Sequence, residues 1–290
     1  MNKKFLLVDG NFLMFQSFYA SYMPNIQLMT DSQGRSTNGV HVFMMTLHKL
    51  IEYINPDYLF IAFDAHGKTK RHEQYEDYKA GRSKAPTIIF EQFAIIKDIL
   101  SSWNIKWFEQ EGDEADDLIA TLCKNSTANN YIYSKDQDLL QLVDANTEVI
   151  FKSKEGFFDT YNIYNFENYH GILPSQIPDY KGLAGDSSDN IKGVNGIGSI
   201  GAKKLINTFG SIENIYANIS QLKGAIKQKL IAGEKDAFFC KSLTTLNKEV
   251  IMNSELDFYS VKKIDKNQGL NKMMEYELNS TIIRWKRISF

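Results

Sequence analysis

The chain contains few residues of the kinds that build soft-metal sites or covalent cross-links. Its 290 residues include two cysteines and five histidines. Cys123 and Cys240 form no CxxC pair and have no histidine at ligand spacing, which argues against a zinc site or a disulfide framework. We expect two free core thiols in a reducing compartment. The histidines stand in no context typical of a Ser–His or Cys–His catalytic pair.

Long hydrophobic runs are also missing. The longest, residues 58–63, is far shorter than the roughly 20 apolar residues that span a bilayer. The N-terminal sequence MNKKFLLVDG is too briefly apolar for a signal peptide. With 43% hydrophobic and 23% charged residues, the composition is that of a globular protein with a sizeable core. We expect a cytoplasmic protein with no membrane attachment.

The formal net charge of −2 conceals strong local imbalance. Residues 192–229 contain six lysines and a single acid, Glu213. Residues 68–84 contain six lysines and arginines against three acids. A near-neutral total with separate acidic and basic stretches is typical of a polyanion binder that also holds cations.

Short apolar runs alternate with helical periodicity in the first part of the chain. Apolar residues between 40 and 54 recur at three- and four-residue steps, and residues 87–102 and 114–124 do the same. Strands separated by amphipathic helices predict an α/β fold, with a mainly parallel sheet flanked by helices. The predicted strands are 5–8, 58–63, 105–108, 131–133 and, with a weaker pattern, 148–151.

From about residue 162 the pattern changes to short helices with joints rich in Gly, Asn and Ser. We predict an α/β core over residues 1–160 and a C-terminal helical subdomain over 161–290, with one helix over 265–278. Two core strands lead into aspartates, Asp9 and Asp64. Ligands of parallel sheets gather at the carboxyl ends of the strands, so we expect the site there.

Carboxylates are concentrated where strands should end or helices should begin. Like charges a few ångströms apart repel strongly in a low-dielectric cleft, and divalent cations would compensate them. Oxygen ligands without His or Cys suit Mg²⁺ or Mn²⁺. The nine candidate ligands are Asp9, Asp64, Glu114, Asp116, Asp117, Asp136, Asp138, Asp186 and Asp189.

Each acidic cluster alone also has a purely structural interpretation. Residues 112–118 open a helix that Asp113 could cap, with Asp116 closing back, and residues 134–139 begin another. Residues 185–190 could be a polar loop. Capping explains each cluster separately, whereas a metal cleft explains all of them together. Two ions about 3.5–4 Å apart, clamping a phosphodiester, need several carboxylates of this kind.

An ordered series of short motifs resembles the 5′-nuclease family, and most closely the 5′-to-3′ exonuclease domain of bacterial DNA polymerase I and its free-standing relatives. The resemblance runs from about residue 4 to about residue 250, in the family's order and spacing. The motifs are Leu7-Val8-Asp9-Gly10, Phe63-Asp64-Ala65, Arg71-His72-Glu73, Tyr78-Lys79-Ala80-Gly81-Arg82, Glu114-Ala115-Asp116-Asp117, Asp136-Gln137-Asp138-Leu139 and Gly185-Asp186-Ser187-Ser188-Asp189-Asn190.

The resemblance implies a PIN-like 5′-nuclease fold and a phosphodiesterase with two Mg²⁺ ions, Mn²⁺ being the substitute. Asp113 departs from the family pattern, and we interpret it as a helix cap. By position, the first metal cluster would be Asp9, Asp64, Glu114 and Asp116, with Asp117 close to both ions. The second would be Asp136, Asp138, Asp186 and Asp189, so the helical subdomain would carry part of the metal site.

Residues 66–86 are rich in Lys and Arg, with Tyr75 and Tyr78 interleaved. A solvated basic helix is one interpretation. Cations that neutralise phosphates and rings that stack on bases would instead suit single-stranded DNA. In the family this stretch resembles the helical arch over the active site. We expect Lys79 and Arg82, and next Arg71, to act on the scissile phosphate, and Tyr78 to contact DNA.

Residues 196–201 spell the G-x-G-x-x-G letters of a dinucleotide site, but they do not follow a strand, so we reject that interpretation. Residues 193–198, followed by residues 202–205, instead resemble the family's helix-three-turn-helix, which grips the duplex backbone without reading sequence. We expect Gly196, Gly198, Lys203 and Lys204 to contact DNA there, and K⁺ to bind the turn's carbonyls. Gly201 stands where the family has a larger residue. A loop over residues 25–38 is either a plain surface loop or a second duplex contact.

The sequence thus predicts a free-standing 5′-3′ exonuclease and 5′-flap endonuclease that removes RNA primers or flaps in DNA replication and repair. We expect a monomer whose partners are 5′ flaps, nicked or gapped duplex and RNA–DNA primers. Two alternatives remain: a branched-DNA binding protein of this fold with weak catalysis, and a metal-dependent ribonuclease.

Overall fold

The chain forms two compact units, each built from separated stretches of sequence. The computed structural model describes residues 2–22, 28–82, 85–153 and 155–290. The first unit comprises Met1–Ala65, Lys84–Lys135 and Lys248–Phe290, and the second comprises His66–Ser83 and Asp136–Asn247. The division predicted at residue 160 remains a prediction. Lys84 of the arch and the start of the 25–38 loop lie outside the described residues.

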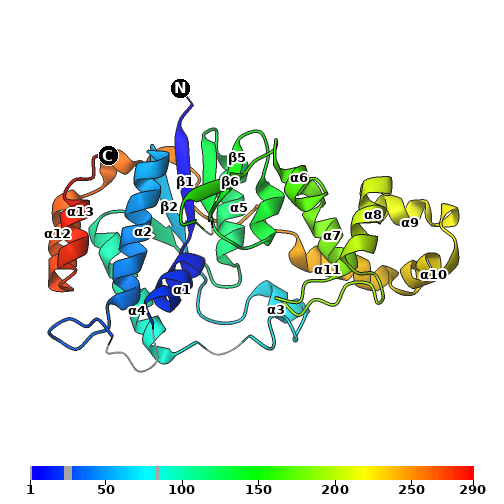
Figure 1. The fold of residues 1–290 in the computed structure, drawn as a ribbon, viewed down its shortest axis with the longest axis horizontal. Coiled ribbons are helices and arrows are strands. Elements are labelled where there is room, and N and C mark those ends of the chain that lie inside the picture. The colour runs from blue at the N-terminus through cyan, green and yellow to red at the C-terminus, as the bar shows by residue number, and fades with distance from the viewer. Residues whose placement is uncertain (1, 23–27, 83–84, 154) are drawn as a thin grey trace. The chain divides into compact units, whose positions relative to one another are not determined.

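The first unit is built on parallel strands, as the sequence predicted (Figure 1). Their order is β3-β2-β1-β4. The central strand β1 is buried from Phe5 to Val8, because neighbours cover both of its edges and helices cover its faces. The bounds are β1 Lys4–Asp9, β2 Tyr58–Ala62, β3 Lys106–Phe108 and β4 Asn129–Tyr133.

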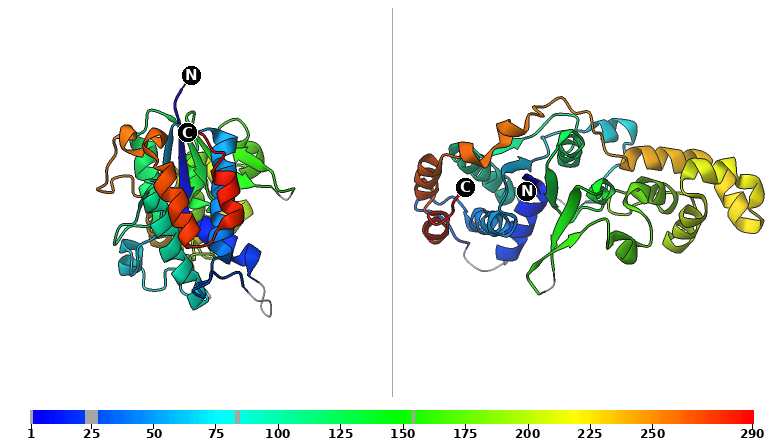
Figure 2. Two further views of the ribbon diagram at one scale, coloured as in Figure 1. Left: turned by 90° about the vertical axis from the view of Figure 1, so that its left-hand side faces the viewer. Right: turned by 90° about the horizontal axis from the view of Figure 1, so that it is seen from above.

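Helices connect these strands and cover them. The connections from β1 to β2 and from β2 to β3 run one way along the sheet, and that from β3 to β4 runs back. With right-handed crossovers, α5 therefore covers the face opposite to α1, α2 and α4. Helices α12 and α13 pack beside α4 and α2 (Figure 2). The bounds are α1 Gly10–Ser21, α2 Asn38–Ile54, α4 Thr87–Ser102, α5 Ala115–Asn125, α12 Lys266–Glu275 and α13 Asn279–Trp285.

The second unit is mostly helical, with one antiparallel hairpin of β5 (Thr147–Lys152) and β6 (Phe158–Tyr161). Its central contact is between α7 and α11, where a Cβ on Gly182 would lie 2.8 Å from the Ala237 carbonyl oxygen. A glycine is therefore required for this close approach. The helices are α3 Lys70–Gln74, α6 Phe166–His170, α7 Ile177–Ala184, α8 Ser199–Phe209, α9 Ile212–Ala217, α10 Gly224–Ala232 and α11 Glu234–Thr244.

Other sequence expectations can be compared directly with the structure. Neither Cys123 nor Cys240 forms a disulfide bond. Within the described ranges, no helix is both long and apolar enough to cross a membrane. The α1 helix and the β6 strand were not predicted.

Two helix glycines should respond oppositely to replacement by alanine. A Cβ on Gly269 of α12 would lie 2.2 Å from the Trp103 ring, so Gly269→Ala should lower the free energy of unfolding by about 1–3 kcal/mol through overpacking. A Cβ on Gly201 of α8 would meet only Ile197, at 3.6 Å, so Gly201→Ala should raise it by about 0.4–1 kcal/mol. Denaturant unfolding of both variants measures the two free energies of unfolding. Equal changes in the two variants would contradict the difference in packing around Gly269 and Gly201.

Candidate metal centre

The carboxyl edge of the parallel sheet places Asp9 and Asp64 as predicted. Asp9 ends β1, where the strand order reverses between β2 and β4, the usual place for a ligand crevice. Its Oδ1 accepts a hydrogen bond from the Phe12 N–H at 2.8 Å and so caps α1. Its Oδ2 accepts one from the Ser134 hydroxyl, just beyond β4, at 2.7 Å. The carboxylate is thus fixed at the strand end.

Hydrogen bonds bring the first turn of α5 to Asp64. The Ala115 N–H donates to Asp64 Oδ1 at 2.8 Å, and Asn11 Nδ2 donates to Asp64 Oδ2 at 2.9 Å. Glu114 is the N-cap of α5, and its N–H donates to Asp117 Oδ2 at 3.0 Å. The prediction that Asp113 caps this helix is therefore wrong, because the helix begins one residue later.

These contacts join Asp64 to the first turn of α5 within one unit. Glu114 and Asp117 are buried, and Asp116 lies in the same helical turn, partly exposed. Negative side chains in a first turn are favoured by the helix dipole, which partly offsets their mutual repulsion. The turn can therefore hold several carboxylates next to Asp64.

The second unit brings three acids of the other predicted cluster together. Oxygens of Asp138, Asp186 and Asp189 all lie within 4.8 Å of one another. Asp136 lies beside them, and its Oδ1 accepts a hydrogen bond from the Asp138 N–H at 2.8 Å. Mg²⁺ binds oxygens at about 2.0–2.1 Å, so a span of this size fits one ion with waters completing its shell. The donor set is the one that Mg²⁺ and Mn²⁺ prefer.

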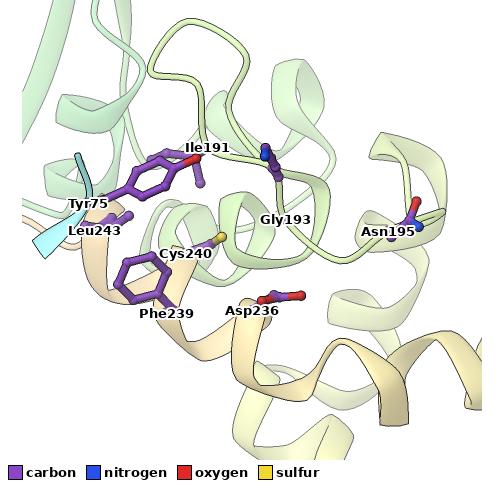
Figure 3. Close-up of a pocket in the computed structure, with 9 residues that line it drawn as sticks. Tyr75, Ile191, Gly193, Asn195, Asp236, Phe239, Cys240 and Leu243 are labelled. Atoms are coloured by element: carbon purple, nitrogen blue, oxygen red, sulfur yellow. The ribbon is translucent and has the colours of Figure 1, made fainter. Parts of the chain in front are cut away.

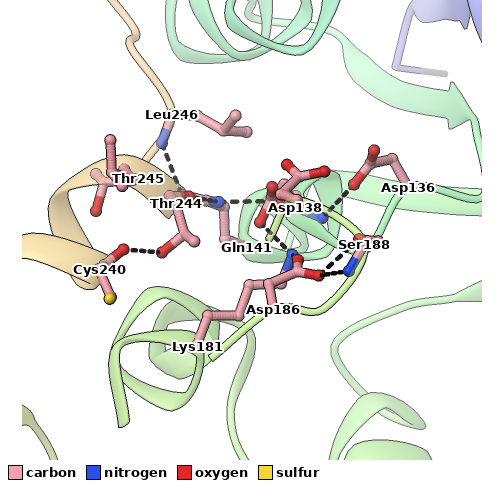
Figure 4. A network of polar contacts seen from close by, with 12 residues as sticks. Asp136, Asp138, Gln141, Lys181, Asp186, Ser188, Cys240, Thr244, Thr245 and Leu246 are labelled. Carbon is pink, nitrogen blue, oxygen red and sulfur yellow. Dashed lines mark hydrogen bonds and ion pairs between the residues drawn. The ribbon is translucent and has the colours of Figure 1, made fainter. Parts of the chain in front are cut away.

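A lysine that the sequence analysis did not single out lies inside this cluster (Figure 4). Lys181 Nζ donates to Asp138 Oδ1 and to Asp186 Oδ2, each at 2.6 Å. Its side chain is 5% exposed, so the ion pairs are largely shielded from water. In the sequence Lys181 follows Ile177 and Pro178 by four and three residues, so it stands on an apolar face of its helix. That face, together with its position five residues before Asp186, is the signal that could have found it.

Burial and ion pairing act in opposite directions on the pKa values of this network. Burial raises the pKa of Asp138 to about 7, although Lys181 opposes the shift. Burial would also raise the pKa of Asp186, but the charge of Lys181 and hydrogen bonds from Lys181 and Ser188 outweigh it and lower the pKa. For Lys181, burial is outweighed by Asp138 and Asp186, which raise its pKa. Lys181 is therefore a cation at neutral pH.

Residues 66–86, called the arch segment from here on, hold Asp189, the third acid of this cluster. The Tyr78 hydroxyl donates to Asp189 Oδ2 at 2.9 Å, and Arg82 Nη2 donates to Asp189 Oδ1 at 2.6 Å. The Lys79 N–H donates to the Asp189 carbonyl at 3.0 Å, with Lys79 in the left-handed region at φ 57°. Both oxygens of Asp189 thus have partners from residues 78–82.

Two residues expected to meet DNA are used inside the protein in this conformation. Tyr78 is 3% exposed, so its ring is not available for stacking on bases. Arg71 Nε donates to the Leu243 carbonyl at 2.8 Å, near the end of α11. Both side chains instead fasten the arch segment to the rest of the second unit.

The glycine-rich turn exposes Gly196 and Gly198 beside the start of α8, while Val194 before them and Ile197 between them are buried. Gly196 has φ 77°, a conformation that favours glycine. Lys229 Nζ donates to the Gly196 carbonyl at 2.9 Å.

The two lysines predicted on α8 differ in exposure. Lys204 is exposed. Lys203 is partly buried, with Nζ 5.8 Å from the centre of the Tyr180 ring. Lys204 is therefore the more accessible to a phosphate.

A pocket of about 540 Å³ lies beside this turn (Figure 3). Its walls are mainly apolar. The ring of Tyr75, in the arch segment, packs edge to face on the ring of Phe239 in α11, with 5.8 Å between the ring centres. Asp236 is the acid among its lining residues, so the pocket is separate from the carboxylate cluster. The lining residues are Tyr75, Ile191, Lys192, Gly193, Asn195, Asp236, Phe239, Cys240 and Leu243.

The described part of the 25–38 loop is fastened to the C-terminal helices of the first unit. Arg35 Nε pairs with Asp31 at 2.6 Å, and its guanidinium lies 4.3 Å from the centre of the Tyr276 ring. The Ser32 N–H donates to Glu277 Oε2 at 3.2 Å. The last segments of the chain therefore fix this loop.

Family comparison divides the chain in two. Residues 4–169 match the model of the 5′-3′ exonuclease N-terminal resolvase-like domain. Residues 172–267 match the model of the 5′-3′ exonuclease C-terminal SAM fold.

Curated relatives include a 5′-3′ exonuclease and several larger DNA polymerases I. The chain is 39% identical to a 5′-3′ exonuclease of Mycoplasmopsis pulmonis over 95% of this chain and 91% of that protein. It is 36% identical to DNA polymerase I of Caldicellulosiruptor bescii and 35% identical to that of Bacillus subtilis, covering 97% and 94% of this chain. It spans 33% and 32% of those two polymerases.

Solved structures share the fold at low sequence identity. A T5 5′-exonuclease with bound zinc aligns with a TM-score of 0.68 at 21% identity, covering 99% of both chains. The catalytic core of Rad2 in complex with DNA substrate aligns with a TM-score of 0.64 at 14% identity, covering 98% of this chain and 93% of that one.

The two arch tyrosines offer a matched test of how Asp189 is held. Tyr78→Phe removes a buried hydrogen bond to a charged group and should lower the free energy of unfolding by about 1.5–3 kcal/mol. Tyr75→Phe removes a bond to the Asn190 carbonyl, a neutral acceptor at 3.2 Å, and should lower it by about 0.5–1.5 kcal/mol. Denaturant unfolding compares them, and a larger loss for Tyr75→Phe would contradict this account.

Proposed function

Because the chain belongs to the 5′-3′ exonuclease family of nucleases, we propose that it is a 5′-3′ exonuclease and 5′-flap endonuclease that hydrolyses DNA with two Mg²⁺ ions. The observation that carries the proposal is the cluster of Asp138, Asp186 and Asp189, whose oxygens lie within 4.8 Å of one another. The hydrogen-bonded acids at the carboxyl edge of the sheet provide the other ligand set, which is the first predicted cluster. The similar 5′-3′ exonuclease of Mycoplasmopsis pulmonis and the similar fold of a bacteriophage T5 flap endonuclease in complex with DNA and metal ions support the substrate class.

The ligand sets follow the two units. Asp9, Asp64, Glu114 and Asp116 would hold one ion, with Asp117 close to both ions. Asp138, Asp186 and Asp189, with Asp136, would hold the other. Bound there, the ions would lower the pKa of a water and stabilise the leaving oxygen of an in-line displacement.

Basic residues would orient the substrate. Lys79 and Arg82 stand next to Asp189 and are the proposed phosphate-steering residues, while Arg71 would act by holding the arch. Gly196 and Gly198 would let the duplex backbone approach the start of α8, where N–H groups and Lys204 can bind phosphate. The proposed K⁺ at this turn would add to the charge that Lys229 already places on the Gly196 carbonyl.

The proposed partners are 5′ flaps, nicked or gapped duplex and RNA–DNA primers, bound by a monomer in the cytoplasm. Labelled 5′-flap DNA, blunt duplex and single-stranded RNA, each incubated with Mg²⁺, test this choice. We expect shortening of duplex 5′ ends and release of flaps, while the single-stranded RNA should be left intact. Binding without cleavage would favour the branched-DNA binding protein, and cleavage of RNA alone would favour the ribonuclease.

Asp186→Ala should reduce cleavage of flap DNA by about 10³-fold or more, because metal stabilisation supplies several kcal/mol to the transition state. DNA binding, measured by fluorescence anisotropy in Ca²⁺, should be retained. The control is Asp159→Asn, because Asp159 is an exposed acid on β6 of the same unit. This variant should keep the cleavage rate and the DNA affinity of the wild type. Full activity of Asp186→Ala would remove the basis for the second ion.

Lys79→Ala should lower kcat by about 10²-fold with a smaller change in KM, as expected when a group stabilises charge in the transition state. Lys68→Ala is the matched control, since Lys68 is an exposed arch lysine. Single-turnover cleavage of a labelled flap gives the rate. Equal losses in both variants would instead indicate that the arch supplies only general positive charge.

A further inference from the structure

Lys181 lies between two of the carboxylates proposed to hold a divalent ion, Asp138 and Asp186. It lies on α7, and the chain turns at Gly185, with φ 79°, so that Asp186 comes back to the ammonium group. A Cβ on Gly185 would lie 2.6 Å from the Ile191 carbonyl oxygen, so this tight reversal requires glycine. The fold therefore builds the contact between Lys181 and Asp186 rather than leaving it to a mobile side chain.

The oxygens of the cluster already have protein donors. Asp186 Oδ2 and Asp138 Oδ1 accept from Lys181, and Asp186 Oδ1 accepts from Ser188 N–H and Oγ at 2.8 and 2.6 Å. A divalent ion that used Asp138 Oδ1 or Asp186 Oδ2 would have to displace the ammonium group. The two cations compete for the same oxygens.

Resting on the proposed function, we propose that Lys181 is a built-in counter-cation of the second metal site. When no divalent ion is bound, its ammonium group neutralises Asp138 and Asp186 and keeps their oxygens close together. When an ion binds, the ammonium group withdraws from at least one of them. Lys181 is then a positioning residue that lowers the affinity for the ion while keeping the empty site folded.

Replacing Lys181 by a neutral side chain separates this role from that of an ordinary buried ion pair. In Lys181→Met the competing cation is lost, so the site should bind Mn²⁺ about tenfold more tightly, within the usual range of coupling between two ligands. In EDTA the same variant should melt at a lower temperature, because Asp138 and Asp186 then repel without compensation. Mn²⁺ should restore more of its melting temperature than it adds to the wild type.

Lys241 of α11 provides a matched control. Its Nζ also bridges two acids, Asp179 at 2.7 Å and Glu213 at 2.8 Å, within the same unit. Lys241→Met should lower the melting temperature in EDTA but leave the Mn²⁺ affinity unchanged. Lys181→Arg, which keeps the charge, should bind Mn²⁺ like the wild type or more weakly.

The experiment is a Mn²⁺ titration of the full chain at constant ionic strength, with free Mn²⁺ measured by electron paramagnetic resonance. The relevant site is the one lost in Asp186→Asn. Lys181→Gln serves as a second neutral variant if Lys181→Met does not fold, and the same increase in affinity is expected. Unchanged or weaker Mn²⁺ binding in the neutral variant overturns the proposal.

Because no DNA is present, this outcome is separate from the test of the nuclease. Normal Mn²⁺ uptake in a protein that cuts no DNA would count against the proposed function and leave the role of Lys181 intact. Absence of the Asp186-dependent site in the wild type would overturn the counter-cation and the second metal site together.

Discussion

Mutual repulsion between carboxylates is the constraint on which the candidate site depends. Two such charges 4 Å apart repel by about 4 kcal/mol at an effective dielectric constant of about 20. Each unit compensates this repulsion in a different way. In the first, backbone N–H groups, Asn11 and Ser134 donate to Asp9, Asp64 and Asp117. In the second, Lys181 and Arg82 place full positive charges against Asp138, Asp186 and Asp189. The polar network is therefore as important to the folded state as it is to the proposed chemistry.

Much of the first unit could be predicted from the sequence because its physical signals are local. Apolar runs gave the parallel strands, and aspartates at strand ends gave Asp9 and Asp64. Helix α1 was missed because apolar and aromatic residues occur all around it, so that it has no amphipathic period. Strand β6 is four residues long and half exposed, too short for a pattern. Asp113 was misjudged as a cap because capping strength alone does not show which of several neighbouring acids begins the helix.

The partners within the site were harder to predict, since they join residues far apart in sequence. Nothing local shows that Tyr78 turns its hydroxyl to Asp189, or that Arg71 binds carbonyls at the end of α11. Basic and aromatic residues suit DNA and suit internal acids equally well. The resemblance to a nuclease family pointed these side chains toward DNA, whereas the structure gives several of them a partner inside the protein.

The hydrogen bonds from Tyr78 and Arg82 to Asp189 couple the position of the arch segment to that of one proposed metal ligand. By thermodynamic linkage, anything that pulls residues 78–82 away from Asp189 must alter the affinity for an ion there, and the ion must alter the ease of that displacement by the same factor. Displacement of residues 78–82 and loading of the ion would then be reciprocal events, each shifting the equilibrium of the other.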